Sequence, residues 1–180
     1  MSQKVVLKNV RISYAHIFQP YGMENGDKKY SVCVIMPKDH PQLKDVKKAI
    51  VEAAKEKFAS KIKDNKMPAS LKSPLRDGEE RDEQPEFEGM LFFNASSTKR
   101  PQVFDRDKSQ LVEEDGKPYS GCYCNLSLNF YAFDVSGNKG VAVGLNGIQF
   151  LKDGEALAGN ANVANDFDEE EVEEDDYSDI

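Results

Sequence analysis

The clearest pattern of hydrophobic and polar positions lies between residues 121 and 134, in the segment GCYCNLSLNFYAFD. Every second position is apolar, which is the period of a β-strand with one face in a core: Cys122, Cys124, Leu126, Leu128, Phe130 and Ala132. The opposite face is polar, uncharged and aromatic: Tyr123, Asn125, Ser127, Asn129, Tyr131 and Phe133. At about 3.3 Å per residue the strand would span roughly 40 Å. We therefore expect it to curve, as strands do in a small closed barrel.

The polar face of this strand has two interpretations. Bases stack on aromatic rings and amides hydrogen-bond to base or sugar edges, so a concave face of this composition suits a single nucleic-acid strand. The other interpretation is an ordinary half-buried strand with tyrosines at the water boundary, which is the commoner use of an amphipathic strand. The pattern alone favours the second interpretation, and the choice depends on the rest of the chain.

Four other segments have strand patterns: Lys4–Tyr14, Lys29–Met36, Met90–Ser97 and Val141–Leu151. In the first segment, one face is expected to carry Val6, Val10, Ile12 and Tyr14. The last segment is interrupted by Gly144 and Gly147, where we expect a bend, a bulge or a close backbone approach. Residues 136–140, SGNKG, predict the hairpin turn that leads into it.

One helix is predicted after the second strand. Asp39 can cap it, Pro41 lies in its first turn, and an apolar stripe extends to about Lys63. Its opposite side carries lysines, for which a solvated face is the commoner explanation and phosphate contact the other: Lys44, Lys48 and Lys55. Residues 64–89 are polar, with acids concentrated between 77 and 88, and they predict a long loop.

Charge is distributed unevenly along the chain. The formal net charge of the 180 residues is −8, but one segment near the end has ten acids and no base: Asp166, Asp168, Glu169, Glu170, Glu171, Glu173, Glu174, Asp175, Asp176 and Asp179. Without them, 24 bases face 22 acids, so the rest of the chain is slightly basic. Such an acidic block cannot bury enough apolar surface to fold, and it usually serves interactions. We expect one domain over residues 1–158 and a linker with a disordered acidic tail over residues 159–180.

The segment from residue 98 to residue 108 interleaves bases with a ring and an amide. This combination indicates nucleic-acid binding better than charge alone does, although two acids dilute it. The residues that carry the signal are Lys99, Arg100, Gln102, Phe104, Arg106 and Lys108.

The sequence has no motif for nucleotide hydrolysis, dinucleotide binding or nucleophilic catalysis. His16 and His40 have no ligand spacing, so neither a metal site nor another cofactor is expected. Cys122 and Cys124 fall on the expected core face and predict inert buried thiols. No apolar run is typical of a signal peptide or a membrane span, and an intracellular location is expected. Enzymatic function is therefore not expected, with a magnesium-dependent nuclease as the alternative left open.

Three segments are informative together: SSTKRPQVFDRD (Ser96–Asp107), SGCYCNLSLNFYAFD (Ser120–Asp134) and NKGVAVGLNGIQFLKDGEALAG (Asn138–Gly159). In this order they resemble the phage-encoded single-stranded DNA-binding proteins of the OB-fold family, to which the replication proteins of T-odd phages are related. The likeness covers most of the chain and is weakest from Lys57 to Glu88.

The resemblance implies a mainly β fold: a five-stranded antiparallel OB-type barrel with one α-helix inserted between strands. It also implies binding of single-stranded DNA without sequence preference, in phage replication, recombination and repair within the bacterial host cytoplasm. For the site we expect base-stacking rings, adaptable hydrogen-bonding amides and phosphate-neutralising bases, in this order: Tyr123, Tyr131 and Phe104; Asn125, Asn129 and Gln102; Lys99, Arg100, Arg106 and Lys139.

In related phage proteins, the acidic tail contacts the replicative DNA polymerase and the primase–helicase and competes with DNA for the basic groove. Residues 166–180 fit this pattern, except that the chain finishes on Ile180 where an aromatic residue is frequent. A homodimer is also expected, because an exposed OB-type sheet edge can pair with another chain. The alternative function is an interaction protein whose acidic tail mimics DNA and acts on a host nucleic-acid-binding protein.

Overall fold

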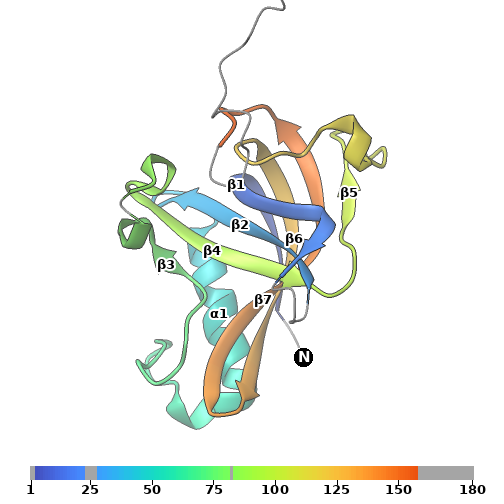
Figure 1. The fold of residues 1–180 in the computed structure, drawn as a ribbon. Coiled ribbons are helices and arrows are strands. Elements are labelled where there is room, and N and C mark those ends of the chain that lie inside the picture. The colour runs from blue at the N-terminus through green and yellow to red at the C-terminus, as the bar shows by residue number, and fades with distance from the viewer. Residues whose placement is uncertain (1–2, 23–27, 82, 158–180) are drawn as a thin grey trace, which may run out of the picture.

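The computed structural model of the chain describes residues 3–22, 28–81 and 83–157. The expected linker and acidic tail lie outside the described residues, as does the expected domain boundary at residue 158. Five long strands dominate the fold, and one α-helix, α1 (Leu43–Phe58), follows the second of them (Figure 1). The strands are β1 (Gln3–Tyr21), β2 (Lys29–Pro37), β4 (Met90–Ser97), β6 (Tyr123–Val135) and β7 (Asn138–Lys152).

These strands close a barrel in the order β1–β2–β4–β7–β6 and back to β1. Four of the five contacts are antiparallel, and the parallel pairing of Ser96 with Gly144 joins β4 to β7 and completes the ring. This strand order and closure confirm the predicted OB-type barrel with one helix between its strands. Two short strands extend it, β3 (Arg76–Asp77) beside β4 and β5 (Gln102–Phe104) beside β7.

The core forms where the alternation along β6 predicts it. The five predicted core residues from Cys122 to Phe130 are 0 % exposed, and Ala132 packs against the same core. Cys122 and Cys124 place their Sγ atoms 3.6 Å apart. That contact and burial raise the pKa of Cys124, so this thiol stays protonated. Both residues therefore behave as the core residues that the sequence predicts.

The helix is shorter than predicted and begins later. Asp39 was expected to cap it, but the helix begins at Leu43 and Asp39 lies in the preceding turn. The side chain of Gln42 does not cap the helix; instead it accepts the N–H of Lys8 (2.7 Å) and donates to the carbonyl of Val6 (2.9 Å). The α-helix ends at Phe58, and a short 3-10 turn, η1 (Ala59–Lys61), replaces its expected continuation to Lys63.

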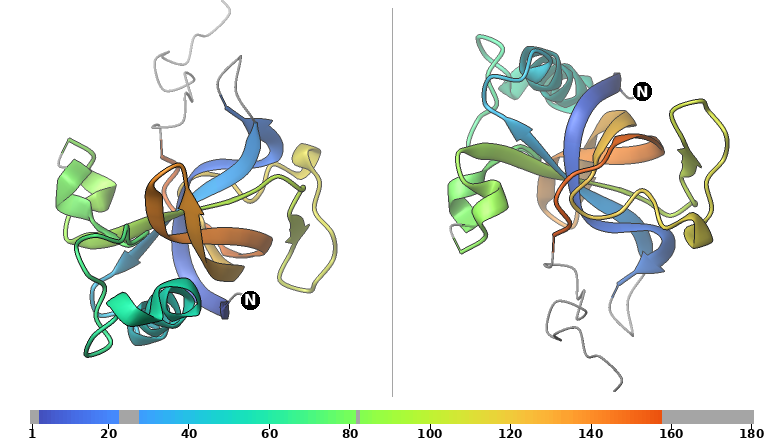
Figure 2. Two further views of the ribbon diagram at one scale, coloured as in Figure 1. Left: turned by 90° about the horizontal axis from the view of Figure 1, so that it is seen from below. Right: turned by 90° about the horizontal axis from the view of Figure 1, so that it is seen from above.

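Helix α1 and the segment that contains β5 lie on opposite sides of the barrel (Figure 2). One side of α1 is buried against the barrel core, where it packs on β1, β6 and β7. The buried residues are Val46, Ala49, Ile50, Ala53, Ala54 and Phe58. No helix in the described part of the chain has the length and apolar character that a membrane crossing requires.

Strand β1 is interrupted by an irregularity that the sequence pattern did not show. The expected face with Val6, Val10, Ile12 and Tyr14 is wrong, because the register against β6 shifts between Leu7 and Val10. Asn9 has a φ of 55°, and its N–H donates to the side-chain oxygen of Asn125 (3.0 Å). As a result Leu7 is buried and Val6 is 47 % exposed. A β-bulge of this kind transfers every residue beyond it to the opposite face.

The predicted loop over residues 64–89 contains structure of its own. Residues 76–89, which we call the strap, include β3 and two 3-10 turns, η2 (Gly78–Arg81) and η3 (Pro85–Phe87). The ring of Phe87 is fully buried against Phe92 on the outer face of β4. The guanidinium of Arg81 lies 5.0–5.6 Å from the ring centroids of Phe92, Phe87 and Tyr14. The strap therefore covers part of the barrel with a second hydrophobic cluster.

Neighbouring rings on the two faces of β6 test this description of the barrel. Phe130→Ala should lower the free energy of unfolding by about 3–5 kcal/mol, because it leaves a cavity in the core. Tyr131→Ala should cost about 1 kcal/mol or less, because Tyr131 is 38 % exposed on the outer face. Urea denaturation of both variants measures the difference, and equal losses would contradict the assignment of the two faces.

Candidate nucleic-acid interface

A single row of paired residues crosses the outer surface of all five barrel strands. Each residue of the row pairs with its neighbour in the register of adjacent strands, and each is at least partly exposed. We call this row the polar belt, and in order around the barrel it consists of His16, Ser31, Ser96, Gly144, Asn129 and Lys4. Its side chains are small or polar in the middle, so a ligand can approach the strands closely there.

Aromatic rings stand at two places along the polar belt. At one end the rings of His16 and Tyr21 are stacked, with centroids 4.2 Å apart, and Tyr21 is 65 % exposed. Partial burial lowers the pKa of His16, so its ring is neutral near pH 7. Further along, the Tyr131 ring lies beside Gly144, where a β-carbon would be 3.7 Å from it. In Figure 1 the end of β4 meets β7 near the centre of the molecule, where Ser96 pairs with Gly144.

Three of the predicted site residues, Gln102, Phe104 and Asn125, lie in two further rows beside the polar belt. Gln102 on β5 is aligned with Gly147 and Ser127, and Phe104 is aligned with Gln149 and Asn125. Val6 and Phe104 help to line a shallow depression of about 160 Å³ on this surface. The structure thus brings Gln102, Phe104, Asn125, Asn129 and Tyr131 onto one continuous outer face of β5, β7 and β6.

The glycines of β7 act as the sequence predicts. Gly144 forms the closing contact with β4, and a β-carbon on Gly147 would lie 3.1 Å from the carbonyl oxygen of Gln102. The register between β6 and β7 also shifts at Ser127, which leaves Asn146 without a partner strand residue. Close approach and a bulge are thus both present in this strand.

The amides on this face are partly engaged with one another. Asn125 donates to the side-chain oxygen of Gln149 (3.0 Å) and accepts the N–H of Asn9 (3.0 Å). Gln149 donates in turn to the carbonyl of Arg106 (3.2 Å). These bonds join β1, β6, β7 and the turn after β5, so Asn125 has a structural role before any ligand binds. The side chain of Asn129 can rearrange more easily, because its amide donates to Asn146 (3.1 Å), which is itself exposed to solvent.

The basic residues predicted to bind phosphates are spread around the barrel. Lys99 and Arg100 are exposed in the connection between β4 and β5, and Arg100 lies 5.9 Å from the ring centroid of Tyr30. Arg106 follows β5 and lies 6.0 Å from the ring of Phe150, at one end of the barrel. Lys139 lies in the β6–β7 hairpin, at the opposite end of β7 from Phe150. The structure therefore does not bring these four bases into one cluster.

Tyr123 is also separated from the polar belt. It lies eight positions before Tyr131 on β6, roughly 26 Å along an extended strand. The ammonium group of Lys152 lies 5.0 Å from the centroid of the Tyr123 ring. Tyr123 also lines a cavity together with residues of β1 and β2. The two tyrosines that share a face in the sequence pattern thus belong to different parts of the surface.

Sequence reasoning missed several residues of this surface: His16, Tyr21, Ser31, Ser96, Asn146 and Gln149. Single serines and amides carry no signal of their own, and only the pairing of strands far apart in sequence places them side by side. His16 and Tyr21 were missed because β1 was expected to end at Tyr14, where a φ of 48° marks an irregularity that the strand passes through. In the described residues, no group of His, Cys, Asp and Glu side chains is arranged to hold a metal ion.

The role of Asn125 can be separated from that of its neighbours by stability. Asn125→Ala should lower the free energy of unfolding by about 1–3 kcal/mol, because the N–H of Asn9 loses its partner. Asn146→Ala should cost about 0.5 kcal/mol or less, since Asn146 is exposed. Thermal or urea unfolding provides the comparison. If the two losses are equal, the network around Asn125 does not support the barrel.

Comparison with known proteins gives consistent results. Residues 3–177 match the model of the family described as "Enterobacter phage Enc34, ssDNA-binding protein". Protein p50 of Acyrthosiphon pisum secondary endosymbiont phage 1 is 36 % identical over 162 residues, which cover 87 % of each chain. The structure of the bacteriophage Enc34 single-stranded DNA-binding protein in complex with ssDNA has a TM-score of 0.75 and 27 % identity, covering 86 % of this chain and 89 % of the other. Bacteriophage T7 gp2.5, a single-stranded DNA-binding protein, shares the fold, with a TM-score of 0.62, 14 % identity and coverage of 96 % and 98 %. The chain belongs to the family of the Enc34 single-stranded DNA-binding protein.

Proposed function

We propose that this protein binds single-stranded DNA along the polar belt, without sequence preference and without catalysing a reaction. The observation that carries the proposal is the belt itself, a row of small polar residues with exposed rings beside it. The belt crosses β2 and β4, the second and third strands of the barrel, which form the usual ligand face of OB-folds. Family membership supports the same activity.

The lack of sequence preference follows from the chemistry of this surface. Any base can stack on Tyr21 or Tyr131, because every base has an aromatic face. Asn125 and Gln149 are held by hydrogen bonds within the protein, so they are poorly placed to select a base edge. Lys4 at the end of the belt, with Lys99 and Arg100 near β4, would neutralise phosphates at a few local positions.

We extend the proposal to DNA replication, recombination and repair in phage-infected cells. The acidic tail would recruit the phage DNA polymerase and primase–helicase, and it would compete with DNA for the bases around the barrel. The support is compositional: ten acids follow a body of nearly balanced charge, and a tethered segment has a high effective concentration near its own domain. A homodimer formed through a sheet edge belongs to the same proposal.

Removal of single rings tests the proposed path. Tyr131→Ala and Tyr21→Ala should each weaken oligo-dT binding by about 1–3 kcal/mol, the contribution of one stacked base. Val135→Ser is the matched control, because Val135 is exposed in the β6–β7 hairpin away from the belt. Fluorescence titration gives the dissociation constants. Unchanged binding by both tyrosine variants would remove the belt as the DNA path.

The same titrations at several salt concentrations separate stacking from charge. Each neutralised phosphate adds about 0.7 to the slope of log affinity against log salt concentration for single strands. Arg100→Gln should reduce that slope by this amount, whereas Tyr131→Ala should leave it unchanged. A change of slope in the tyrosine variant would show that its loss is not a loss of stacking.

Deletion of residues 166–180 tests the tail independently of the belt. The shortened protein should bind oligo-dT more tightly than the full chain at low salt, because a competing anion is removed, and the difference should shrink as salt rises. It should also bind the phage polymerase less well in a pull-down. Weaker DNA binding after the deletion would be the opposite of competition and would reject that part of the proposal.

A further inference from the structure

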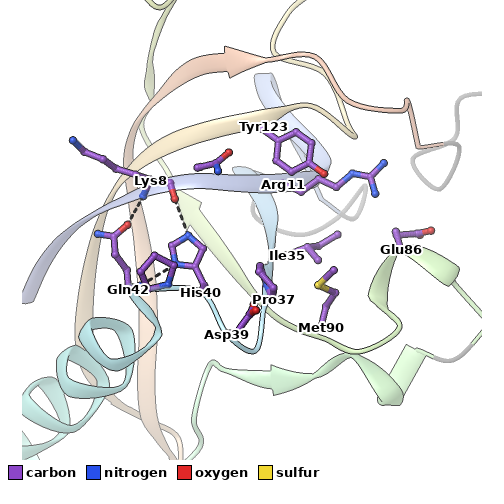
Figure 3. Close-up of a pocket in the computed structure, with 12 residues that line it drawn as sticks. Lys8, Arg11, Ile35, Pro37, Asp39, His40, Gln42, Glu86, Met90 and Tyr123 are labelled. Atoms are coloured by element: carbon purple, nitrogen blue, oxygen red, sulfur yellow. Dashed lines mark hydrogen bonds between the residues drawn. The ribbon is translucent and has the colours of Figure 1, made fainter.

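A cavity of about 670 Å³ lies on the side of the barrel formed by β6, β1 and β2 (Figure 3). It is distinct from the polar belt. Along the outer face of β2, Ser31 belongs to the belt, Cys33 is buried beneath the strap, and Ile35 lines the cavity. The strap therefore lies between the two surfaces, and Ser31 and Ile35 are roughly 13 Å apart along β2.

One wall of the cavity combines an aromatic ring with a fixed cation. Tyr123 and Arg11 are paired across β6 and β1, and Figure 3 shows both at the same side of the cavity. The guanidinium of Arg11 donates to the carbonyl of Gly121 (3.1 Å) and to the carbonyl of Glu155 (2.7 Å). A guanidinium has five N–H donors, so donors are left for a ligand while the side chain is held in place.

The two chain segments whose carbonyls bind Arg11, around Gly121 and Glu155, are themselves held together by hydrogen bonds. The Tyr119 hydroxyl donates to the carboxylate of Asp153 (2.8 Å) and accepts the N–H of Gly154 (3.2 Å). A β-carbon on Gly154 would lie 2.1 Å from the carbonyl oxygen of Gly121, so this close approach requires glycine. The two carbonyls that orient Arg11 are thus fixed by the fold, and the cation is positioned in advance of binding.

The opposite wall is fixed by a second set of hydrogen bonds. The His40 ring lies between the carbonyl of Lys8, to which Nε2 donates (2.8 Å), and the N–H of Gln42, which Nδ1 accepts (3.0 Å). Ile35, Pro37 and Met90 add apolar surface between the two walls.

The charge of the lining indicates which part of a nucleotide would enter. Two basic side chains, Lys8 and Arg11, are balanced by two acidic side chains, Asp39 and Glu86. Neither carboxylate has an ion pair with a described residue, so both are available to repel phosphate. A run of phosphates is therefore disfavoured inside the cavity, whereas a flat base suits its ring and apolar surface, with one phosphate at Arg11.

We propose that this cavity is a second nucleotide site, which takes one unstacked base of a DNA strand already bound at the polar belt. Tyr123 stacks on the base, Arg11 binds the adjoining phosphate, and Lys152 adds positive charge beside the Tyr123 ring. This inference rests on the proposed function, because the strand must reach the cavity from the belt. In this proposal, Tyr123 binds the part of a DNA strand that extends past the polar belt.

Oligonucleotide length distinguishes the second site from the belt. A dT oligomer of about 8 nucleotides fits within the range of one OB-fold site, whereas one of about 30 nucleotides exceeds it. Tyr123→Leu and Lys152→Glu in the full chain should bind the short oligomer as the unchanged protein does. Tyr123→Leu should bind the long oligomer about 5- to 150-fold more weakly, the loss of one base stack. Lys152→Glu should also weaken binding of the long oligomer, because it reverses a charge beside that ring. Lys47→Glu is the matched charge control, because Lys47 is exposed on α1 outside the cavity.

Each outcome of this comparison is decisive. The proposal is overturned if both variants bind the long oligomer as the unchanged protein does, or if they lose the same factor with both oligomers, since Tyr123 would then belong to the primary path. It is also overturned if Lys47→Glu matches Lys152→Glu. Circular dichroism and the urea midpoint monitor folding, and Lys152→Glu decides the question if Tyr123→Leu is destabilised. Failure of the unchanged protein to bind either oligomer would reject the proposed function itself.

Discussion

The whole surface depends on the contact that closes the barrel, where Ser96 on β4 pairs with Gly144 on β7. Without it, β4 and β7 would lie toward opposite ends of a curved sheet, each beside only a short strand, and the outer faces of β4 and β7 would not join. The contact requires β7 to pair with β6 along one edge while β4 and then β5 follow the other edge. A β-carbon at Gly144 would lie 3.7 Å from the Tyr131 ring, an ordinary contact distance, and glycine leaves the backbone open to a ligand there.

The parts of the fold that alternate regularly could be predicted from the sequence. The core face of β6 and the hairpin between β6 and β7 follow from a two-residue period and its turn residues, and the predicted bounds of β4 are also observed. The misplaced parts depend on hydrogen bonds between distant residues. Gln42 bonds to β1 and does not cap α1, and the N–H of Asn9 bonds to Asn125, which moves Leu7 into the core. No local pattern contains either interaction.

The same distinction applies to the candidate site. Aromatic and basic residues such as Tyr131 and Arg100 can be proposed as DNA contacts from the sequence. Ser31 and Ser96 can be placed at the site only once the pairing of β2 with β4 is known. The spacing of Tyr123 and Tyr131 predicted one shared face, and curvature of β6 separated them onto two surfaces. The strap shows the reverse error: an acid-rich segment read as a loop buries Phe87 completely and holds Arg81 among three rings.

Strand β1 supplies both ends of the polar belt, Lys4 at one end and His16 at the other. A row that leaves a strand at position 4 and returns to it at position 16 has not closed into a ring; it has advanced along the strand, as the stagger of a closed barrel requires. The path of the polar belt is therefore helical. A polymer that follows it once around leaves at a different height from where it entered, so its two ends pass each other and stay free to continue onto neighbouring molecules.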